Sequence, residues 1–187
     1  MKDGKIAVDS DFETSEPGVY AIGDVAARTQ LAHVAAAQGT YVVEKIAGRP
    51  HSIKLEVVPN GMFVSLPIVP NCIYTDPEIA TVGITEEIAK KYGLKVRCGH
   101  FSMRDNGKSI ITGEEHGFIR LLFEAYSNTI VGAQMMCPRA TDMIGEIATA
   151  IANGLTAQEM SFAMRAQPTY NEGIGAAIED AMRQNPV

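Results

Sequence analysis

Clusters of basic side chains are absent from this sequence. Its 187 residues carry a formal net charge of −6, and no run of Lys or Arg is longer than two residues. Binding to nucleic-acid phosphates requires clustered cations, so we expect no nucleic-acid partner. The sequence also has no stretch of 18 apolar residues that would span a membrane, and residues 1–5 lack the apolar centre of a signal peptide. These absences predict a cytoplasmic protein without a membrane partner.

Cysteine is scarce, and its spacing excludes the common cysteine motifs. Cys72, Cys98 and Cys137 include no CxxC and no pair four residues apart. Neither a zinc site nor a local redox disulfide is therefore expected. The histidines include no pair with the i, i+4 spacing of a metal site, so we expect no bound metal. The simplest interpretation of the cysteines is buried thiols in a reducing compartment.

Proline and glycine divide the chain into three regions. Hydrophobic residues make up 46% and charged residues 20%, which is the composition of an ordinary globular protein. Residues 49–70 contain four prolines and a glycine, and we expect them to form a connector. This connector separates residues 1–48 from a domain of residues 71–187.

The first region combines a short apolar run with a longer alanine-rich segment. Residues 18–24 predict a buried strand that ends at a Gly-Asp step. Residues 31–47 contain no proline and are followed by Gly48, so they predict a helix with a glycine stop.

The third region shows strand patterns first and helix patterns later. This order favours an α+β fold, in which an antiparallel sheet carries helices on one side, over a doubly wound sheet. Alternating or continuous apolar runs predict strands at residues 79–82, 94–99, 118–126 and 129–136, the last two as a hairpin. Cap residues and glycine stops predict helices at residues 86–92, 141–153 and 172–183, and another that begins at Thr156 with a capping box.

Two places in the sequence offer candidate functional groups. Asp24 follows Gly23 at the end of the predicted strand, where a carboxylate can accept hydrogen bonds from the hydroxyls of a ligand. The alternative is that Asp24 only caps the next helix. Farther along the chain, Pro168 interrupts a helical region and would bring the amide of Gln167 near the carboxylate of Glu172. The alternative there is a turn in which Glu172 opens the last helix.

Five ordered segments resemble the disulfide oxidoreductases of the dihydrolipoamide dehydrogenase type. TSEPGVYAIGDV resembles the second flavin-binding signature of that family, and the LAH segment resembles the helix that follows it. IYTDPEIATVG resembles the first strand pair of the interface domain, and GFIRLL with IVGA resembles its hairpin. QPTYNE resembles the His-Pro-Thr…Glu motif. These segments are residues 14–25, 31–39, 73–83, 117–133 and 167–172.

The resemblance implies roles for both candidate places. Residues 1–48 would be a remnant of an FAD-binding domain, in which Gly23 and Asp24 lie at the ribityl chain of the flavin. The backbone at Leu31 and Ala32 would approach the isoalloxazine edge. Residues from 71 onward would form a homodimer interface.

The resemblance also implies that Gln167 and Glu172 reach into the partner subunit's active site. In the family, a histidine at the position of Gln167 is the acid–base group for a small dithiol or disulfide substrate, and the glutamate orients it. Glutamine cannot take up a proton near neutral pH, and a thiol attacks as its thiolate. A parent enzyme with this glutamine is therefore expected to be impaired in dithiol chemistry.

The sequence departs from the family in a second way. The Gly-rich motifs for FAD and NAD(P) and the redox cysteine pair do not occur in it. We expect the full-length parent to use FAD and NAD(P), and this chain alone to bind neither tightly and to be inactive. The alternatives are a stand-alone dimerisation or interaction module without catalysis, and a fragment of a glutathione reductase-like enzyme.

Overall fold

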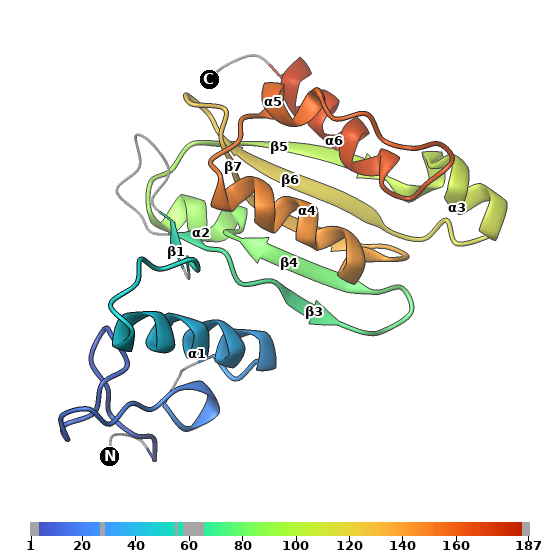
Figure 1. Cartoon of the computed structure of the whole chain (residues 1–187). Coiled ribbons are helices and arrows are strands. Elements are labelled where there is room, and N and C mark those ends of the chain that lie inside the picture. The colour runs from blue at the N-terminus through green and yellow to red at the C-terminus, as the bar shows by residue number, and fades with distance from the viewer. Residues whose placement is uncertain (1–3, 27–28, 55, 58–65, 185–187) are drawn as a thin grey trace. The chain divides into compact units, whose positions relative to one another are not determined.

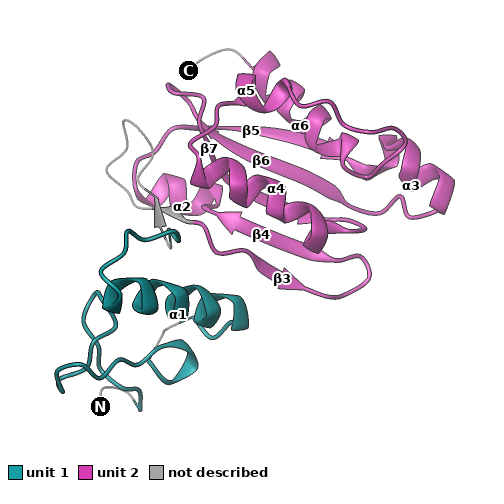
Figure 2. Ribbon diagram, viewed as in Figure 1, with its two compact units in different colours: residues 1–55 teal, residues 56–187 magenta. Residues whose placement is uncertain are grey.

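The chain folds into two compact units, residues 1–55 and residues 56–187 (Figures 1 and 2). The structure is a computed structural model, and it describes residues 4–26, 29–54, 56–57 and 66–184. The expected connector, residues 49–70, lies partly outside these described residues. The division into regions 1–48, 49–70 and 71–187 stays a prediction.

The first unit is built on one amphipathic helix. Helix α1 spans Ala32–Ile46, and its buried side chains Val34, Gln38 and Val42 recur every four residues on one face. Gly48, which follows the helix, has a positive φ of 62°, a conformation that glycine adopts without strain. The helix predicted from alanine content and the glycine stop is therefore confirmed.

The strand predicted for residues 18–24 is wrong. The segment forms only an isolated antiparallel bridge, between Glu13 and Tyr20. Its end bends at Gly23, whose φ is 68°, into a short 3-10 helix, η1, of residues Gly23–Val25. The segment is apolar as expected, but its backbone turns into η1 before a second residue can pair with a neighbouring strand.

The second unit contains a five-stranded antiparallel sheet. Its strand order is β3-β4-β7-β6-β5, and every neighbouring pair is antiparallel. The predicted fold class, an α+β domain with an antiparallel sheet, is therefore confirmed. The strands are β3 (Asn71–Ile73), β4 (Ile79–Gly83), β5 (Val96–Ser102), β6 (Phe118–Glu124) and β7 (Ile130–Met136), and a separate two-stranded pair is formed by β1 (Glu56–Val57) and β2 (Leu66–Pro67).

Two longer helices cover one face of the sheet (Figure 1). Helix α4 packs on β4 and β7, and α6 packs on β5 and β6. No helix in the described part of the chain is long and apolar enough to cross a bilayer. The helices of this unit are α2 (Glu86–Lys91), α3 (Gly107–Thr112), α4 (Ala140–Ala152), α5 (Ala157–Ser161) and α6 (Glu172–Arg183), with a 3-10 turn η2 (Met103–Asp105) before α3.

Glycines allow α6 to lie unusually close to the sheet. A Cβ atom added at Gly99 of β5 would lie 1.9 Å from the carbonyl oxygen of Ala177 and 2.9 Å from the Cβ of Ala181. A Cβ added at Gly173, in the first turn of α6, would lie 3.0 Å from the ring of Phe101. The contact between Gly173 and Phe101 holds the beginning of α6 on the sheet, and therefore also positions the turn that precedes the helix.

Helix caps and the hairpin turn agree with their sequence signals. The Thr85 hydroxyl accepts a hydrogen bond from the Ile88 amide at the start of α2. Both bonds of the capping box between Thr156 and Glu159 are present at the start of α5. Asn128 takes the positive φ of 60° that the turn between β6 and β7 requires.

Candidate functional site

The turn before α6 is closed by its own hydrogen bonds. The peptide bond between Gln167 and Pro168 is cis. The amide of Thr169 donates to Oε2 of Glu172 over 2.8 Å, and the Thr169 hydroxyl donates to the carbonyl of Ala166 over 2.6 Å. Glu172 is also the first residue of α6. Glu172 therefore opens the last helix, as the structural alternative for this residue predicted.

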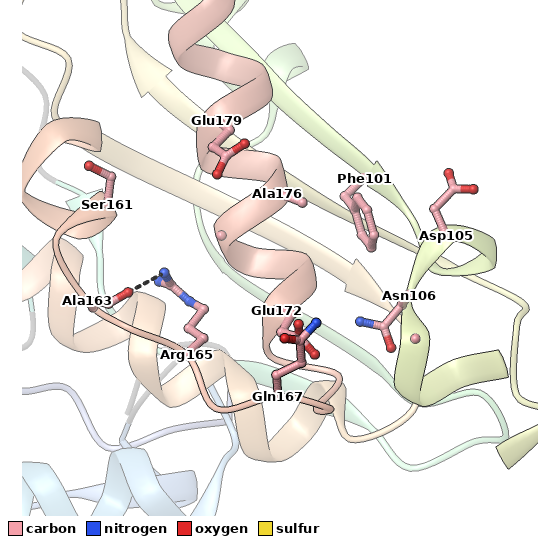
Figure 3. Close-up of a pocket in the computed structure, with 12 residues that line it drawn as sticks. Phe101, Asp105, Asn106, Ser161, Ala163, Arg165, Gln167, Glu172, Ala176 and Glu179 are labelled. Atoms are coloured by element: carbon pink, nitrogen blue, oxygen red, sulfur yellow. Dashed lines mark hydrogen bonds between the residues drawn. The ribbon is translucent and has the colours of Figure 1, made fainter. Parts of the chain in front are cut away.

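Gln167 and Glu172 line the same cavity, which has a volume of about 430 Å³ (Figure 3). The Gln167 side chain is exposed, whereas Glu172 is half-buried. The cavity lies between the start of α6, the loop before it and the segment from β5 to α3. It is lined by Phe101, Asp105, Asn106, Gly107, Ser161, Ala163, Arg165, Gln167, Glu172, Gly175, Ala176 and Glu179.

The cavity carries more negative than positive charge. Asp105, Glu172 and Glu179 contribute carboxylates, while the guanidinium of Arg165 is already paired with Glu146. The Gln167 amide can donate and accept hydrogen bonds, but it does not bind a proton near neutral pH. Among the described residues, no hydrogen bond joins it to Glu172, whose carboxylate holds the Thr169 amide instead. The cavity can therefore bind polar groups, and its proton acceptors are carboxylates.

Asn106 supports the turn from α3, and the sequence did not single it out. The residue is buried, with 2% exposure. Its Nδ2 donates to the carbonyl of Thr169 over 3.0 Å, and its Oδ1 accepts from the Ser109 amide over 2.9 Å. Asparagine is a favoured N-cap residue, and that preference is the one local signal in the sequence that could have identified it.

The candidate flavin-contacting residues lie together in the first unit. The Gly23 amide donates to Oε1 of the buried Gln38 over 2.8 Å. Asp24 is exposed in η1, and no described residue donates a hydrogen bond to its carboxylate. Leu31 occupies the N-cap position of α1, without a side-chain cap bond, and the exposed Ala32 begins the helix. The alternative that Asp24 only caps the next helix is wrong, because the N-cap of α1 is Leu31.

The three cysteines are free thiols in different surroundings. Cys137 is fully buried, and burial, reinforced by the nearby charge of Glu78, raises its pKa to about 12. Cys72 is half-buried, and burial raises its pKa as well. Cys98 is also half-buried and accepts a hydrogen bond from Nε of Arg120 over 3.4 Å. The prediction of buried thiols is therefore confirmed for Cys137, whereas Cys72 and Cys98 are only half-buried.

Two known protein families match separate parts of the chain. The dimerisation domain of the pyridine nucleotide-disulphide oxidoreductases matches residues 69–178. A second family, described as pyridine nucleotide-disulphide oxidoreductase, matches residues 1–39.

Two similar curated relatives are both named dihydrolipoyl dehydrogenase. The chain is 37% identical over 177 residues to a dihydrolipoyl dehydrogenase of Bacillus subtilis, and 36% identical over 180 residues to one of Chlorobaculum tepidum. The alignments cover 94% and 96% of this chain, but only 35% and 36% of the relatives. The chain therefore spans about a third of the length of the curated relatives that it matches.

Solved structures show the same fold. LpdA from Mycobacterium tuberculosis superimposes with a TM-score of 0.82 at 26% identity, over 94% of this chain and 36% of that one. The flavoprotein disulfide reductase RclA from Escherichia coli superimposes with a TM-score of 0.80 over 97% of this chain and 39% of that one, but at 17% identity it supports the fold alone. Together with the family match over residues 69–178, the antiparallel sheet and its covering helices show that the chain belongs to the pyridine nucleotide-disulphide oxidoreductase family and carries its dimerisation domain.

Proposed function

We propose that the chain provides the homodimer interface and one side of the active site of a flavin-dependent NAD(P)H/disulfide oxidoreductase of the dihydrolipoamide dehydrogenase type. The observation that carries the proposal is the turn from Gln167 to Glu172. It lies within the matched dimerisation domain and presents both side chains to one cavity. In this proposal, the turn completes the active site of the partner subunit.

FAD and NAD(P) belong to the full-length parent in this proposal. When bound, the flavin supplies electron transfer between a small dithiol or disulfide substrate and the nicotinamide. The carboxylate of Asp24 is exposed and accepts no hydrogen bond from a described residue, so it can accept hydrogen bonds from ribityl hydroxyls. The proposal assigns to the same flavin site the neighbouring Gly23, whose amide donates to Gln38, and the backbone of Leu31 and Ala32 at the start of α1. This chain alone is expected to bind neither cofactor tightly.

The proposal also includes a cytoplasmic location and excludes nucleic-acid and membrane partners. Free thiols fit a reducing compartment such as the cytoplasm. The net charge of −6 makes a nucleic-acid partner unfavourable, and the proposal includes no membrane partner.

The chemistry of the turn is limited by Gln167. A thiolate nucleophile needs a group that accepts the thiol proton, and an amide side chain does not accept it. Glu172 holds the Thr169 amide, so its carboxylate orients the turn. Gln167 would then bind and orient the substrate by hydrogen bonds, without moving its proton.

Replacing Gln167 with histidine in the flavoprotein tests the proposal. General acid–base groups contribute about 10²- to 10⁴-fold in rate, so Gln167→His should raise dihydrolipoamide turnover by about a hundredfold or more. Gln158→His, at an exposed position on α5, introduces the same side chain away from the cavity and should leave turnover unchanged. Equal turnover of both variants and the unmodified protein would overturn the assignment of Gln167.

A stand-alone dimerisation module without catalysis is the second candidate. Its favouring observation is that no His, Cys or Lys side chain is among the described residues that line the cavity. The absorbance spectrum of the protein purified from its natural source separates the candidates. A flavin spectrum supports the oxidoreductase, and a colourless protein supports the module.

A further inference from the structure

One carboxylate on α4 holds both ends of the turn that contains Gln167. Arg165, which precedes the turn, forms an ion pair through Nη2 with Oε1 of Glu146. Asn171, which closes the turn, donates from Nδ2 to Oε2 of the same Glu146 over 3.0 Å. The two oxygens of Glu146 therefore bind two residues that flank the segment from Ala166 to Tyr170.

The ion pair is partly shielded from water. The Arg165 side chain is only 8% exposed, and the Glu146 side chain is 33% exposed. Nη1 of Arg165 also donates to the carbonyl of Ala163 over 3.2 Å (Figure 3). The Arg165 side chain also packs against α6 at Gly175, where an added Cβ would lie 3.5 Å from Cδ and Nη1 of Arg165. A shielded pair with fixed geometry is stronger than an exposed one.

The other contacts of the turn join two of its own residues or hold its later part. The Thr169 hydroxyl donates to the carbonyl of Ala166, which closes the turn on itself. The carbonyl of Thr169 accepts from Asn106, and its amide donates to Glu172. The Tyr170 hydroxyl contacts Thr112 and Glu114. None of these contacts joins Arg165 or Ala166 to another element of the fold. The position of the exposed Gln167 side chain therefore depends on where Arg165 is held, and Arg165 is held by Glu146.

We propose that Glu146 is a positioning residue, which fixes the orientation of Gln167 and Glu172 by clamping the two ends of the turn onto α4. This inference rests on the proposed function for its consequence in catalysis. The clamp itself is a property of this chain and can be measured on the chain alone.

Hydrogen exchange on this chain tests the clamp. Removing the carboxylate with Glu146→Ala frees Arg165 and Asn171 together. Hydrogen bonds to charged groups are strong enough that the Thr169 amide should then exchange about tenfold faster. Glu146→Gln retains one acceptor oxygen and should give an intermediate rate. Amides of β6 and β7 should keep their protection in both variants, because the sheet does not depend on the clamp.

The matched control is Asp142→Asn on the same helix. Asp142 pairs with Arg139, and the two side chains are 68% and 70% exposed, so this substitution removes an α4 carboxylate without affecting the turn. Exchange at Thr169 should be the same as in the unmodified chain. If Glu146→Ala leaves Thr169 exchange unchanged, or accelerates it only as much as exchange in β6 and β7, the positioning role is wrong.

Turnover separates this inference from the proposed function. In the flavoprotein carrying Gln167→His, adding Glu146→Ala should remove most of the gain in kcat, and adding Glu146→Gln should restore part of it. Adding Asp142→Asn should keep the full gain. A full gain with Glu146→Ala overturns the positioning role alone. If Gln167→His gives no gain, the proposed function fails, and hydrogen exchange at Thr169 decides the clamp by itself.

Discussion

Glu172 has two structural roles at the scale of a single residue. It opens α6, where a negative charge interacts favourably with the helix dipole, and it accepts the hydrogen bond from the Thr169 amide. Substituting it would disturb the helix and the turn together. Gln167 is exposed and outside any helix, so a substitution there reports on the chemistry of the site with little effect on the fold.

Cys137 should be unreactive in the folded chain. Its thiol is buried and has a pKa of about 12, so roughly one part in ten thousand is thiolate at pH 8. Titration with a thiol-specific reagent should modify at most two of the three cysteines in the folded chain and all three in denaturant. Cys137→Ala should leave the folded count unchanged and lower the unfolded count by one. Rapid modification of Cys137 in the folded chain would contradict its burial.

At the scale of elements, the contact between β5 and α6 positions the site. Gly99→Ala would place a Cβ 1.9 Å from the Ala177 carbonyl, so the strand and the helix must separate. Overpacking of this kind costs about 3 kcal/mol, and we expect a loss of that size in the free energy of unfolding measured in urea.

Gly145→Ala is the control for this substitution. Gly145 lies in α4, and an added Cβ there meets no atom within 4 Å. Alanine is the better helix former, so this variant should be as stable as the unmodified chain or more stable. Equal stability of the Gly99→Ala chain would mean that β5 and α6 are not packed as described.

Elements with strong local signals could be predicted from the sequence. The bounds of α6 at Glu172–Arg183 agree with the prediction, and the Thr156–Glu159 capping box forms as expected. Short elements were predicted only where a cap residue or the family resemblance indicated them. Helix α3 was not predicted, although it has six residues like α2, and β3 was expected only from the resemblance of residues 73–83. Residues 18–24 show the opposite error, since an apolar run alone does not supply a neighbouring strand to pair with.

The residues of the candidate site also fall into those that could be predicted from the sequence and those that could not. Gln167 and Glu172 were identified because they are five positions apart in one motif. Asn106 and Glu146 contact the same turn from positions 63 and 25 residues away from their bonded partners, Thr169 and Asn171. No local pattern encodes such contacts, so only the folded chain reveals them.

At the scale of the whole molecule, the site is half of a proposed shared centre. The fold is that of a dimerisation domain, and the turn with Gln167 is exposed in the single chain. Close to that turn, Phe162 is 70% exposed and Met164 is 100% exposed. Large apolar side chains that are exposed together mark interaction surfaces. An interface that includes this segment would cover it and bring Gln167 to the partner subunit.

The chain should therefore be a homodimer, and replacing Phe162 and Met164 together with glutamate should shift it to monomer. Two buried carboxylates on each side of a symmetric interface would be desolvated without partners, which is strongly unfavourable. Light scattering after size-exclusion chromatography measures the mass directly. Tyr126→Glu, at a side chain that is 71% exposed on the turn between β6 and β7, should remain dimeric. A monomeric unmodified chain at micromolar concentration would contradict the homodimer, whereas a dimer that survives both glutamates would place the interface elsewhere and separate it from the turn with Gln167.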